Sequence, residues 1–406
     1  MKNHSKKKIF LLGMKSDFYK YQAQTSPYPL SLEISKAKGS YIYDQKGKKY
    51  LDFIAGVSAN TLGHNHSKVV NAIKDQADLY LHVMVYGEFI QSPQVELSKL
   101  LVKNLPDSLN SVYLTNSGTE ATEGAMKLAK RVTGRGEIIS AKNAYHGNTQ
   151  GSMSVCGKEE QNSAFRPLIP GIKFIEFNNE SNLDLISDQT AAVILETIQG
   201  GAGFIEPQND YLKKVKQKCE EVGAMLILDE IQSGIGRTGK FYGFENYHVI
   251  PDILVTGKGL GGGMPIGAFI SSKKNMDTLI RNPKLGHITT FGGHPVIAAA
   301  ALATLQELFR STLIQDSLKK EKLIRKLLIH PSIVEIRGKG LMLAVLLKDS
   351  ESVNQVILNA IKKGLLLFWL LFEPKAIRIT PPLTINEVEI KKGCKIILDL
   401  LNHTDY

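Results

Sequence analysis

Two short apolar runs, each ending in an ionisable residue, constrain this chain more than any other feature. Leu226–Leu228 is followed directly by Asp229, and Val255–Gly257 is followed directly by Lys258. Runs of this kind before glycine-containing turns are typical of buried parallel strands, whose carboxyl ends are where open α/β sheets bind ligands. We therefore expect Asp229 and Lys258 at one edge of one sheet. They form either a structural ion pair or part of a ligand site.

Between about residues 110 and 270 the sequence alternates strand-like runs, glycine-containing turns and helical periodicity. Val112–Thr115 precedes a helical pattern over Glu120–Val132, and Ala192–Glu196 ends in a glycine-rich turn. A further helix is expected over Asp210–Val222, with Asn209 as its N-cap. Strands that alternate with helices predict an α/β fold with a doubly wound, mostly parallel sheet.

The two ends of the chain have a different pattern. Gly39–Phe53 alternates apolar and polar residues around a turn, which indicates a hairpin, and Pro295–Phe309 begins a region of helices and shorter strands. These features predict a smaller α+β domain that the N-terminal segment joins. We expect an N-terminal arm and part of the small domain over 1–60, a large domain over 61–285, and the C-terminal small domain over 286–406.

Composition excludes several classes of protein. The net charge of +11 arises from 50 Lys and Arg against 39 Asp and Glu, but the basic residues are spread along the chain, so we expect no nucleic-acid partner. Three distant cysteines, Cys156, Cys219 and Cys394, predict no disulfide framework and no zinc site. The apolar run Ile9–Leu12 is too short for a signal peptide, and Leu365–Leu371 is too short to span a bilayer. We expect a cytoplasmic protein with no membrane partner.

Several local motifs have both a functional and a structural interpretation. Ser117–Thr119 opens a helix, where backbone N–H groups and hydroxyls suit an anion, but Ser and Thr also cap helices without any ligand. Tyr145 could offer an aromatic face to a flat cofactor or simply pack. The pair His64 and His66 has the spacing of two metal ligands, but no further ligands lie nearby in the sequence, so a turn is favoured.

The glycines around Lys258 admit a dinucleotide-binding interpretation and therefore an oxidoreductase. Gly257, Gly259 and Gly262 match the GxGxxG fingerprint, but Gly263–Ile270 has the pattern of a turn and a strand, not of the required helix. A phosphate loop also fails, because glycine follows Lys258 where Ser or Thr is needed. A lysine with space around it, and a carboxylate on a neighbouring strand, are what pyridoxal phosphate needs: covalent attachment and a partner for its pyridine nitrogen.

Taken together, the motifs resemble the class III aminotransferases of the ornithine and acetylornithine type. The most specific segment is Leu228–Gly239, followed by Lys258 at the family spacing and by Thr289–Pro295; the resemblance extends from Gly39 to Pro382. It implies the type I fold of PLP-dependent transferases and a homodimer with shared active sites. It also implies ping-pong transfer of an amino group from an ornithine-like, N-acetylornithine-like or other ω-amino donor to a 2-oxo acid, by default 2-oxoglutarate.

The resemblance also implies roles for individual residues. Lys258 would hold the cofactor covalently and move the substrate proton, and Asp229 would keep the pyridine nitrogen protonated. Gln232 would bind the ring's 3-oxygen, Tyr145 would stack on the ring, and Thr290 would reach the phosphate from the neighbouring subunit. The remaining expected cofactor-binding positions are Ser117, Gly118 and Thr119 at the phosphate, with His146 and Glu196 in supporting positions.

The chain departs from the family pattern where the substrate would bind. Asn148 stands where an arginine commonly grips a carboxylate, and Gly201 stands where a glutamate is thought to gate an arginine. His294 replaces a usual asparagine, and Thr197 a usual proline. Arg378 remains the candidate for binding a carboxylate. The expected substrate-binding residues are Asn148, Thr289 and Arg378.

Two further functions stay open at this point. An isomerase or racemase on the same fold would use the same cofactor residues but make no oxo-acid product. A non-catalytic binding protein of the same fold would explain the altered substrate positions. Neither interpretation requires a metal ion, and we expect none.

Overall fold

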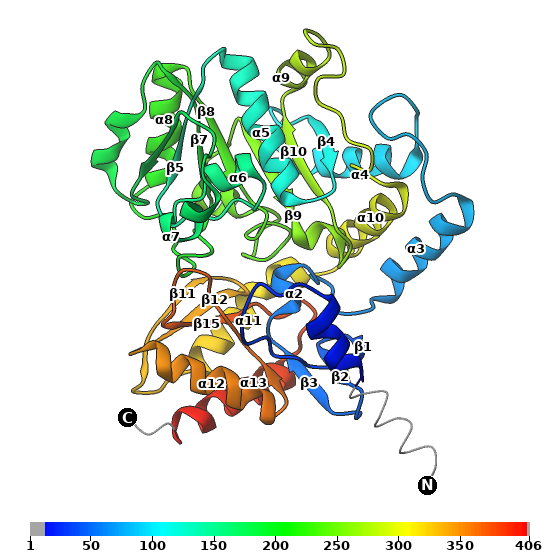
Figure 1. Ribbon diagram of the computed structural model, residues 1–406, viewed down its shortest axis with the longest axis vertical. Helices are drawn as coiled ribbons and strands as arrows, with labels where there is room; N and C mark the ends of the chain where they lie inside the picture. Colours follow the sequence, from blue (N-terminus) through cyan, green and yellow to red (C-terminus); the bar gives the residue numbers. More distant parts are fainter. Residues whose placement is uncertain (1–12, 404–406) are drawn as a thin grey trace.

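The computed structural model describes residues 13–403, which form three sheets and the helices around them (Figure 1). The largest sheet has seven strands in the order β4-β10-β9-β8-β7-β5-β6. All neighbouring pairs from β9 to β6 are parallel, while β10 runs antiparallel to both β9 and β4. The strands are β4 (Ser111–Thr115), β5 (Glu137–Ala141), β6 (Ile172–Ile175), β7 (Thr190–Glu196), β8 (Met225–Asp229), β9 (Ile253–Gly257) and β10 (Gly267–Ser271).

Both faces of this sheet are covered by helices, which explains why its central strands are apolar at every position. Along β8, Leu226 and Leu228 join the core beneath α8 (Tyr211–Val222), whereas Ile227 joins the core beneath α5 (Gly118–Thr133). Successive side chains of a strand point to opposite faces, so a continuous apolar run requires cover on both. The doubly wound α/β prediction is confirmed.

Two four-stranded sheets lie in the lower part of the molecule in Figure 1. One has the order β1-β2-β3-β13, in which β13 comes from near the C-terminus and pairs in parallel with β3. The other has the order β11-β12-β15-β14. Their strands are β1 (Ile34–Lys38), β2 (Tyr41–Asp44), β3 (Lys49–Asp52), β11 (Ile333–Lys339), β12 (Met342–Leu347), β13 (Leu365–Leu366), β14 (Phe368–Trp369) and β15 (Ala376–Ile379).

Long helices complete the arrangement, and among them α10 (Pro295–Arg310) begins where the helix Pro295–Phe309 was predicted to begin. The helix α10 packs against α3 and α4, and α13 packs against α11 and α12. Their bounds are α3 (Ser67–Leu79), α4 (Ser92–Lys103), α10 (Pro295–Arg310), α11 (Leu313–Leu327), α12 (Ser350–Lys362) and α13 (Glu387–Leu401). Among residues 13–403 no single helix is long and apolar enough to cross a membrane, although the pair α10 and α11, bent by 70°, passes the same test together.

Some local predictions need correction. Asn209 is not the N-cap of α8, because Asp210 occupies that position with φ 55° and forms no side-chain capping bond. The strand β1, within the segment 1–60 that was expected to hold the N-terminal arm and part of the small domain, pairs with β2. The GxGxxG interpretation fails, since the short 3₁₀ turn η4 (Lys258–Gly261) and then β10 follow the lysine, where the fingerprint needs a helix.

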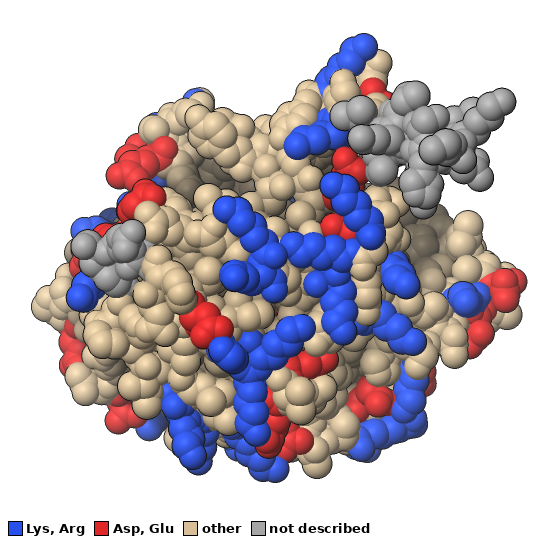
Figure 2. Space-filling view, turned by 90° about the horizontal axis from the view of Figure 1, so that it is seen from below, with Lys and Arg blue, Asp and Glu red and all other residues tan. Residues whose placement is uncertain are grey.

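The division of the chain at residues 60 and 285 stays a prediction, and the pairing of β13 with β3 supports it. The stretch Met1–Leu12, which includes the apolar run of the signal-peptide argument, lies outside the described residues. Figure 2 shows the molecule from below. Lys and Arg side chains extend across the middle of this face, with Asp and Glu interspersed. The expected absence of a nucleic-acid partner stays a prediction.

Candidate active site

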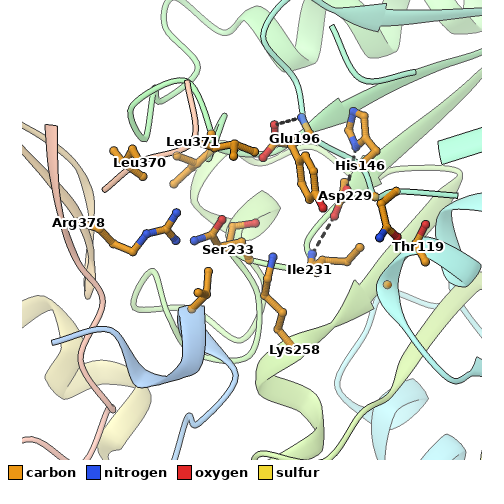
Figure 3. A pocket seen from close by; sticks show the side chains of 18 of the residues that line it. Thr119, His146, Glu196, Asp229, Ile231, Ser233, Lys258, Leu370, Leu371 and Arg378 are labelled. Atoms are coloured by element: carbon orange, nitrogen blue, oxygen red, sulfur yellow. Dashed lines mark hydrogen bonds and ion pairs between the residues drawn. The ribbon is translucent and has the colours of Figure 1, made fainter. Parts of the chain in front are cut away.

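A cavity of about 560 Å³ lies at the carboxyl edge of the parallel strands (Figure 3). Glu196 and Asp229 are the last residues of β7 and β8, and Lys258 follows β9 directly. Asp229 and Lys258 therefore lie at one edge of one sheet, as expected. The cavity is lined by Val57, Gly118, Thr119, Tyr145, His146, Gly147, Asn148, Glu196, Ile198, Gly201, Asp229, Ile231, Gln232, Ser233, Lys258, Phe368, Trp369, Leu370, Leu371 and Arg378.

Asp229 is held in place from two sides. Its Oδ2 atom lies 2.8 Å from Nδ1 of His146, and its Oδ1 atom accepts a hydrogen bond of 2.9 Å from the backbone N–H of Ile231. Both the Asp229 and His146 side chains are buried. Asp229 forms no ion pair with Lys258 among the described residues, so the simple structural-pair interpretation fails.

Glu196 faces the same part of the cavity and also binds backbone groups. Its Oε1 atom accepts from the N–H of Tyr145 at 3.0 Å, and its Oε2 atom accepts from the N–H of Gly200 at 2.8 Å. Burial raises the pKa of Glu196 from 4.5 to about 7, because desolvation disfavours the charged form. The residue therefore fixes the loops that follow β5 and β7.

Lys258 extends its amine into the middle of the cavity (Figure 3). Burial lowers the pKa of Lys258, since its charged form loses hydration. The backbone of Lys258 has φ 40°, a left-handed conformation that non-glycine residues rarely adopt. A lysine amine of lowered pKa is a better nucleophile and proton acceptor at neutral pH than an ordinary one.

Arg378 approaches from the opposite side, on β15 (Figure 3). Its guanidinium group lies 5.6 Å from the ring of Phe204, and its Nε donates to the carbonyl of Trp369 at 3.4 Å. Its Nη1 atom is buried and has no hydrogen-bond partner within the described chain. Burial lowers the pKa of Arg378 to about 10, which still leaves it charged at neutral pH. The Arg378 guanidinium can therefore bind an anion in the cavity.

The start of α5 borders the cavity where the strand β4 ends. A Cβ atom added at Gly118 would lie 2.6 Å from Cδ1 of Ile231, so only glycine permits this close approach. Thr119 also lines the cavity, and its hydroxyl lies 2.5 Å from that of Ser152 and 2.9 Å from that of Thr149. Backbone N–H groups at a helix start can bind an anionic group.

Three predicted site residues lie outside the cavity lining of this chain. Ser117 caps α5 by accepting from the N–H of Glu120 at 3.3 Å. Thr289 accepts from the side-chain amide of Asn116 at 3.1 Å, and Thr290 is exposed. Their roles stay predictions, since Thr290 was expected to act on a neighbouring subunit.

Sequence reasoning missed a strained turn that brings Val57 to the cavity. The residues from Ala55 to Ser58 all have positive φ, between 48° and 70°, and Val57 itself has φ 59°. Such a conformation is a genuine outlier for a β-branched residue. Asp52 anchors the turn, because its Oδ1 accepts from the N–H groups of Ile54 and Ala55 at 2.7 and 3.1 Å.

The carboxylate of Asp52 is also the partner of His64. Its Nε2 atom lies 2.7 Å from Oδ2 of Asp52, so His64 is a partner of the anchor and not the start of a metal site. Among residues 13–403, no group of three or more His, Cys, Asp or Glu side chains is arranged to hold a metal ion. Sequence reasoning also missed the apolar wall of Phe368, Trp369, Leu370 and Leu371, which the run Leu365–Leu371 signalled only as hydrophobic.

The fold and this site are those of the class III aminotransferases. The family described as aminotransferase class-III matches residues 21–401, and the chain belongs to this family. The chain is therefore a class III aminotransferase, and the oxidoreductase, racemase and binding-protein alternatives give way to it.

The similar proteins are named after different substrates. An acetylornithine aminotransferase from Caldanaerobacter subterraneus subsp. tengcongensis is 38% identical over 387 residues, covering 92% of this chain and 95% of its own length. An ornithine aminotransferase from Toxoplasma gondii, solved with partial occupancy of PLP at its active site, has a TM-score of 0.86 at 30% identity, covering 95% of this chain and 93% of that one. An adenosylmethionine-8-amino-7-oxononanoate aminotransferase from Methanocaldococcus jannaschii has a TM-score of 0.88 at 30% identity, covering 97% and 99%.

Proposed function

We propose that the chain binds pyridoxal phosphate at the sheet edge and transfers an amino group from an ornithine-like, N-acetylornithine-like or other ω-amino donor to a 2-oxo acid. The observation that carries the proposal is the placement of Lys258 and Asp229 on one cavity without an ion pair between them. The names of the relatives support an acetylornithine or ornithine type of donor. The acceptor favoured by sequence, 2-oxoglutarate, stays a prediction.

Buried polar atoms without partners support a fit to the cofactor. Nε2 of Gln232 and Nε2 of His146 form no hydrogen bond to any described residue. A buried donor without a partner costs roughly 1–3 kcal/mol, so such atoms indicate that a bound group completes them. Gln232 would donate to the ring's 3-oxygen, and the start of α5 at Gly118 and Thr119 would hold the phosphate.

The pair Asp229 and His146 suits the pyridine nitrogen. When bound, pyridoxal phosphate supplies an aldehyde that accepts the amino group and a ring that draws electron density from the substrate carbon. Asp229 would keep a proton on that nitrogen, and His146 keeps Asp229 oriented through the 2.8 Å contact. Tyr145, whose side chain is about 38% exposed and lines the cavity, would lie on one face of the ring.

Lys258 would bind the cofactor covalently and then carry the proton. Its amine has no ion-pair partner among residues 13–403, and its lowered pKa leaves a larger neutral fraction to accept a proton from the donor carbon. Arg378, with its free Nη1, would bind the substrate carboxylate at the other side of the amine. The two side chains thereby fix the reacting carbon between them.

A homodimer is part of the proposal. Thr290 is exposed, and its neighbour Phe291 is 52% exposed. The loop before α4 exposes Phe89 and Ile90 at 57% and 96%. The rings of His82 and Phe291 lie 4.7 Å apart, so the two segments adjoin. Exposed large apolar side chains on two adjoining segments are typical of a protein interface. Thr290 would then reach the phosphate bound by the neighbouring subunit.

Replacement of the lysine tests the proposal. Lys258→Ala should lose both the visible absorbance band of lysine-bound cofactor and the formation of a new amino acid from a donor and a 2-oxo acid. Lys240→Ala, at an exposed position, is the matched control and should retain both. Transamination near the wild-type rate in Lys258→Ala would show that the assignment of Lys258 is wrong.

A further inference from the structure

The substrate side of the cavity carries a single free cation. Among the described residues that line the cavity, Lys and Arg are represented by Lys258 and Arg378 alone. Lys258 is committed to the cofactor in the proposed function, which leaves Arg378. No carboxylate among residues 13–403 forms an ion pair with it. Among the described residues of one chain, a substrate with one carboxylate therefore finds one cation in the cavity lining, and a second carboxylate finds no further cation there.

The surface near Arg378 is largely apolar, although Ser233 lies beside the guanidinium group (Figure 3). Trp369 turns its only polar atom away from substrate, since its Nε1 donates to Oδ1 of Asn354 at 2.7 Å. Asn148, which also lines the cavity, contributes an uncharged amide. The apolar side chains that line the cavity on this side are Val57, Ile198, Phe368, Trp369, Leu370 and Leu371. Burying an unpaired carboxylate against such a surface is strongly unfavourable.

One small hairpin carries both the cation and this wall. In the antiparallel pair of β14 and β15, Phe368 is the register partner of Arg378, and Trp369 is the partner of Ile377. Directly opposed residues in such a pair have their side chains on the same face. The carboxylate-binding group and the apolar surface are therefore fixed relative to each other by backbone pairing.

Gly201 lines the cavity at a point that has little room for a side chain. The backbone N–H of Phe372 donates to the carbonyl of Gly201 at 2.9 Å, and a Cβ atom added at Gly201 would lie 2.9 Å from the ring of Phe372. Contacts below 3.0 Å do not occur for real Cβ atoms, so a side chain at this position requires the ring to move. No acidic side chain lines the cavity beside Arg378 among the described residues.

We propose that both substrates of this enzyme carry one carboxylate, bound by Arg378, and an uncharged remainder that packs on the apolar wall. The inference rests on the proposed function. It selects monocarboxylic 2-oxo acids, such as pyruvate or 4-methyl-2-oxopentanoate, over 2-oxoglutarate. It also selects donors such as N-acetylornithine, whose substituents apart from the reacting amine and one carboxylate are uncharged. The donor carbon loses its amino group and two electrons and takes its carbonyl oxygen from water. The acceptor carbonyl carbon gains the amino group and two electrons, and its oxygen leaves as water.

The test compares two acceptors of similar size. With one donor, kcat/KM is measured for 4-methyl-2-oxopentanoate, which ends in an isopropyl group, and for 2-oxoglutarate, which ends in a carboxylate. We expect the first to be favoured on the order of 100-fold, the size of discrimination that an unpaired polar group produces. An equal or higher value for 2-oxoglutarate overturns the inference and leaves the proposed function standing. Failure of every acceptor with every donor would instead contradict the proposed function.

A variant that adds a positive charge to the cavity provides a second test. Asn148→Arg adds a second guanidinium to the cavity lining and should shift the ratio towards 2-oxoglutarate by at least about 10-fold, since a bidentate pair then becomes available. Asn148→Gln changes size without charge and should keep the wild-type preference. A ratio that does not move in Asn148→Arg counts against an uncharged wall as the cause of selectivity.

Binding without turnover separates recognition from chemistry. Calorimetry on the PLP-loaded full chain should show that 4-methylpentanoate binds more tightly than glutarate, and that Arg378→Ala weakens the former by at least about 10-fold. Tighter binding of glutarate, or binding of 4-methylpentanoate unaffected by Arg378→Ala, would overturn the proposal.

Discussion

Nδ1 of His146 lies 2.8 Å from Oδ2 of Asp229, and both side chains are buried at the end of β8. The histidine thus occupies one lone-pair direction of the carboxylate and fixes its orientation towards the cavity. His146 reaches this position from the loop after β5, which neighbours β7 and not β8 in the sheet. The contact consequently joins the loop after β5 to the end of β8, across the intervening strand β7.

We predict that His146→Ala weakens both the cofactor site and catalysis. Loss of a hydrogen-bond partner to a buried charged group costs roughly 1–3 kcal/mol, which corresponds to about 10–100-fold in affinity for pyridoxal phosphate and in kcat. Absorbance titration and steady-state rates measure the two effects. His403→Ala, at an exposed position, is the control. Unchanged cofactor affinity in His146→Ala would remove the positioning role of the histidine.

A second prediction concerns Glu230, which is fully buried behind the site. Its carboxylate accepts from the hydroxyls of Thr197 and Ser233 and from the N–H groups of Gly243 and Phe244, at 2.6 to 2.8 Å. Burial raises the pKa of Glu230 from 4.5 to about 7. Between these values the folded state binds more protons than the unfolded state, so this group's contribution to stability falls as pH rises.

Comparison of wild type with Glu230→Gln measures that contribution. The free energy of unfolding of wild type minus that of the variant should decrease from pH 4.5 to pH 7, by up to roughly 3 kcal/mol, and then level off. Denaturant titrations across this range provide the values. Glu88→Gln, at an exposed position, should give a flat difference. A difference that grows with pH would contradict the assigned direction.

A third prediction concerns Arg237, whose side chain is only 2% exposed. Its Nη1 atom donates to the carbonyl of Leu341 at 3.1 Å and to that of Pro381, so it ties the loop after β8 to the segments that flank β12 and β15. Arg237→Ala leaves both carbonyls unpaired and opens a cavity, at a cost of about 3–5 kcal/mol in the free energy of unfolding. Arg310→Ala, which is exposed, should stay within about 0.5 kcal/mol of wild type.

The fourth prediction concerns the anchor of the strained turn. Asp52→Ala removes the acceptor for two backbone N–H groups and leaves His64 without its partner. We expect a loss of about 2–4 kcal/mol in stability and a raised KM, because Val57 no longer keeps its place in the cavity wall. Thermal unfolding and steady-state kinetics measure these effects against Asp78→Asn, at an exposed position. A variant with wild-type KM would show that the turn does not shape the substrate site.

Sequence reasoning predicted the large sheet well because its signals are local. The run Leu226–Leu228 is apolar at every position since both faces of β8 are covered, and the glycine that ends β9 marks the place where Lys258 begins a turn. The helix α5 followed from 3.6-residue periodicity. The same signals placed Asp229 and Lys258 at one edge.

The substrate wall escaped prediction because it depends on contacts far apart in the chain. Phe368 and Trp369 reach the cavity only because β14 pairs with β15, and nothing in a short apolar run tells which surface it will cover. Val57 escaped for another reason, since its left-handed conformation contradicts the preference of a β-branched residue and is imposed by Asp52. The N-cap of α8 was missed because both Asn209 and Asp210 adopt positive φ. That conformation depends on how the preceding loop connects to the helix and not on the residue types alone.

The short distance that a Cβ atom at position 201 would have to the ring of Phe372 also limits the order in which this enzyme could change its substrates. An acidic side chain at position 201 meets the ring unless position 372 first becomes smaller, so the same substitution is harmful in one background and acceptable in another. Libraries that vary position 201 alone would therefore miss variants in which an acidic side chain fits at that position. Paired randomisation of the two positions, with the smaller residue at 372 introduced first, opens that route.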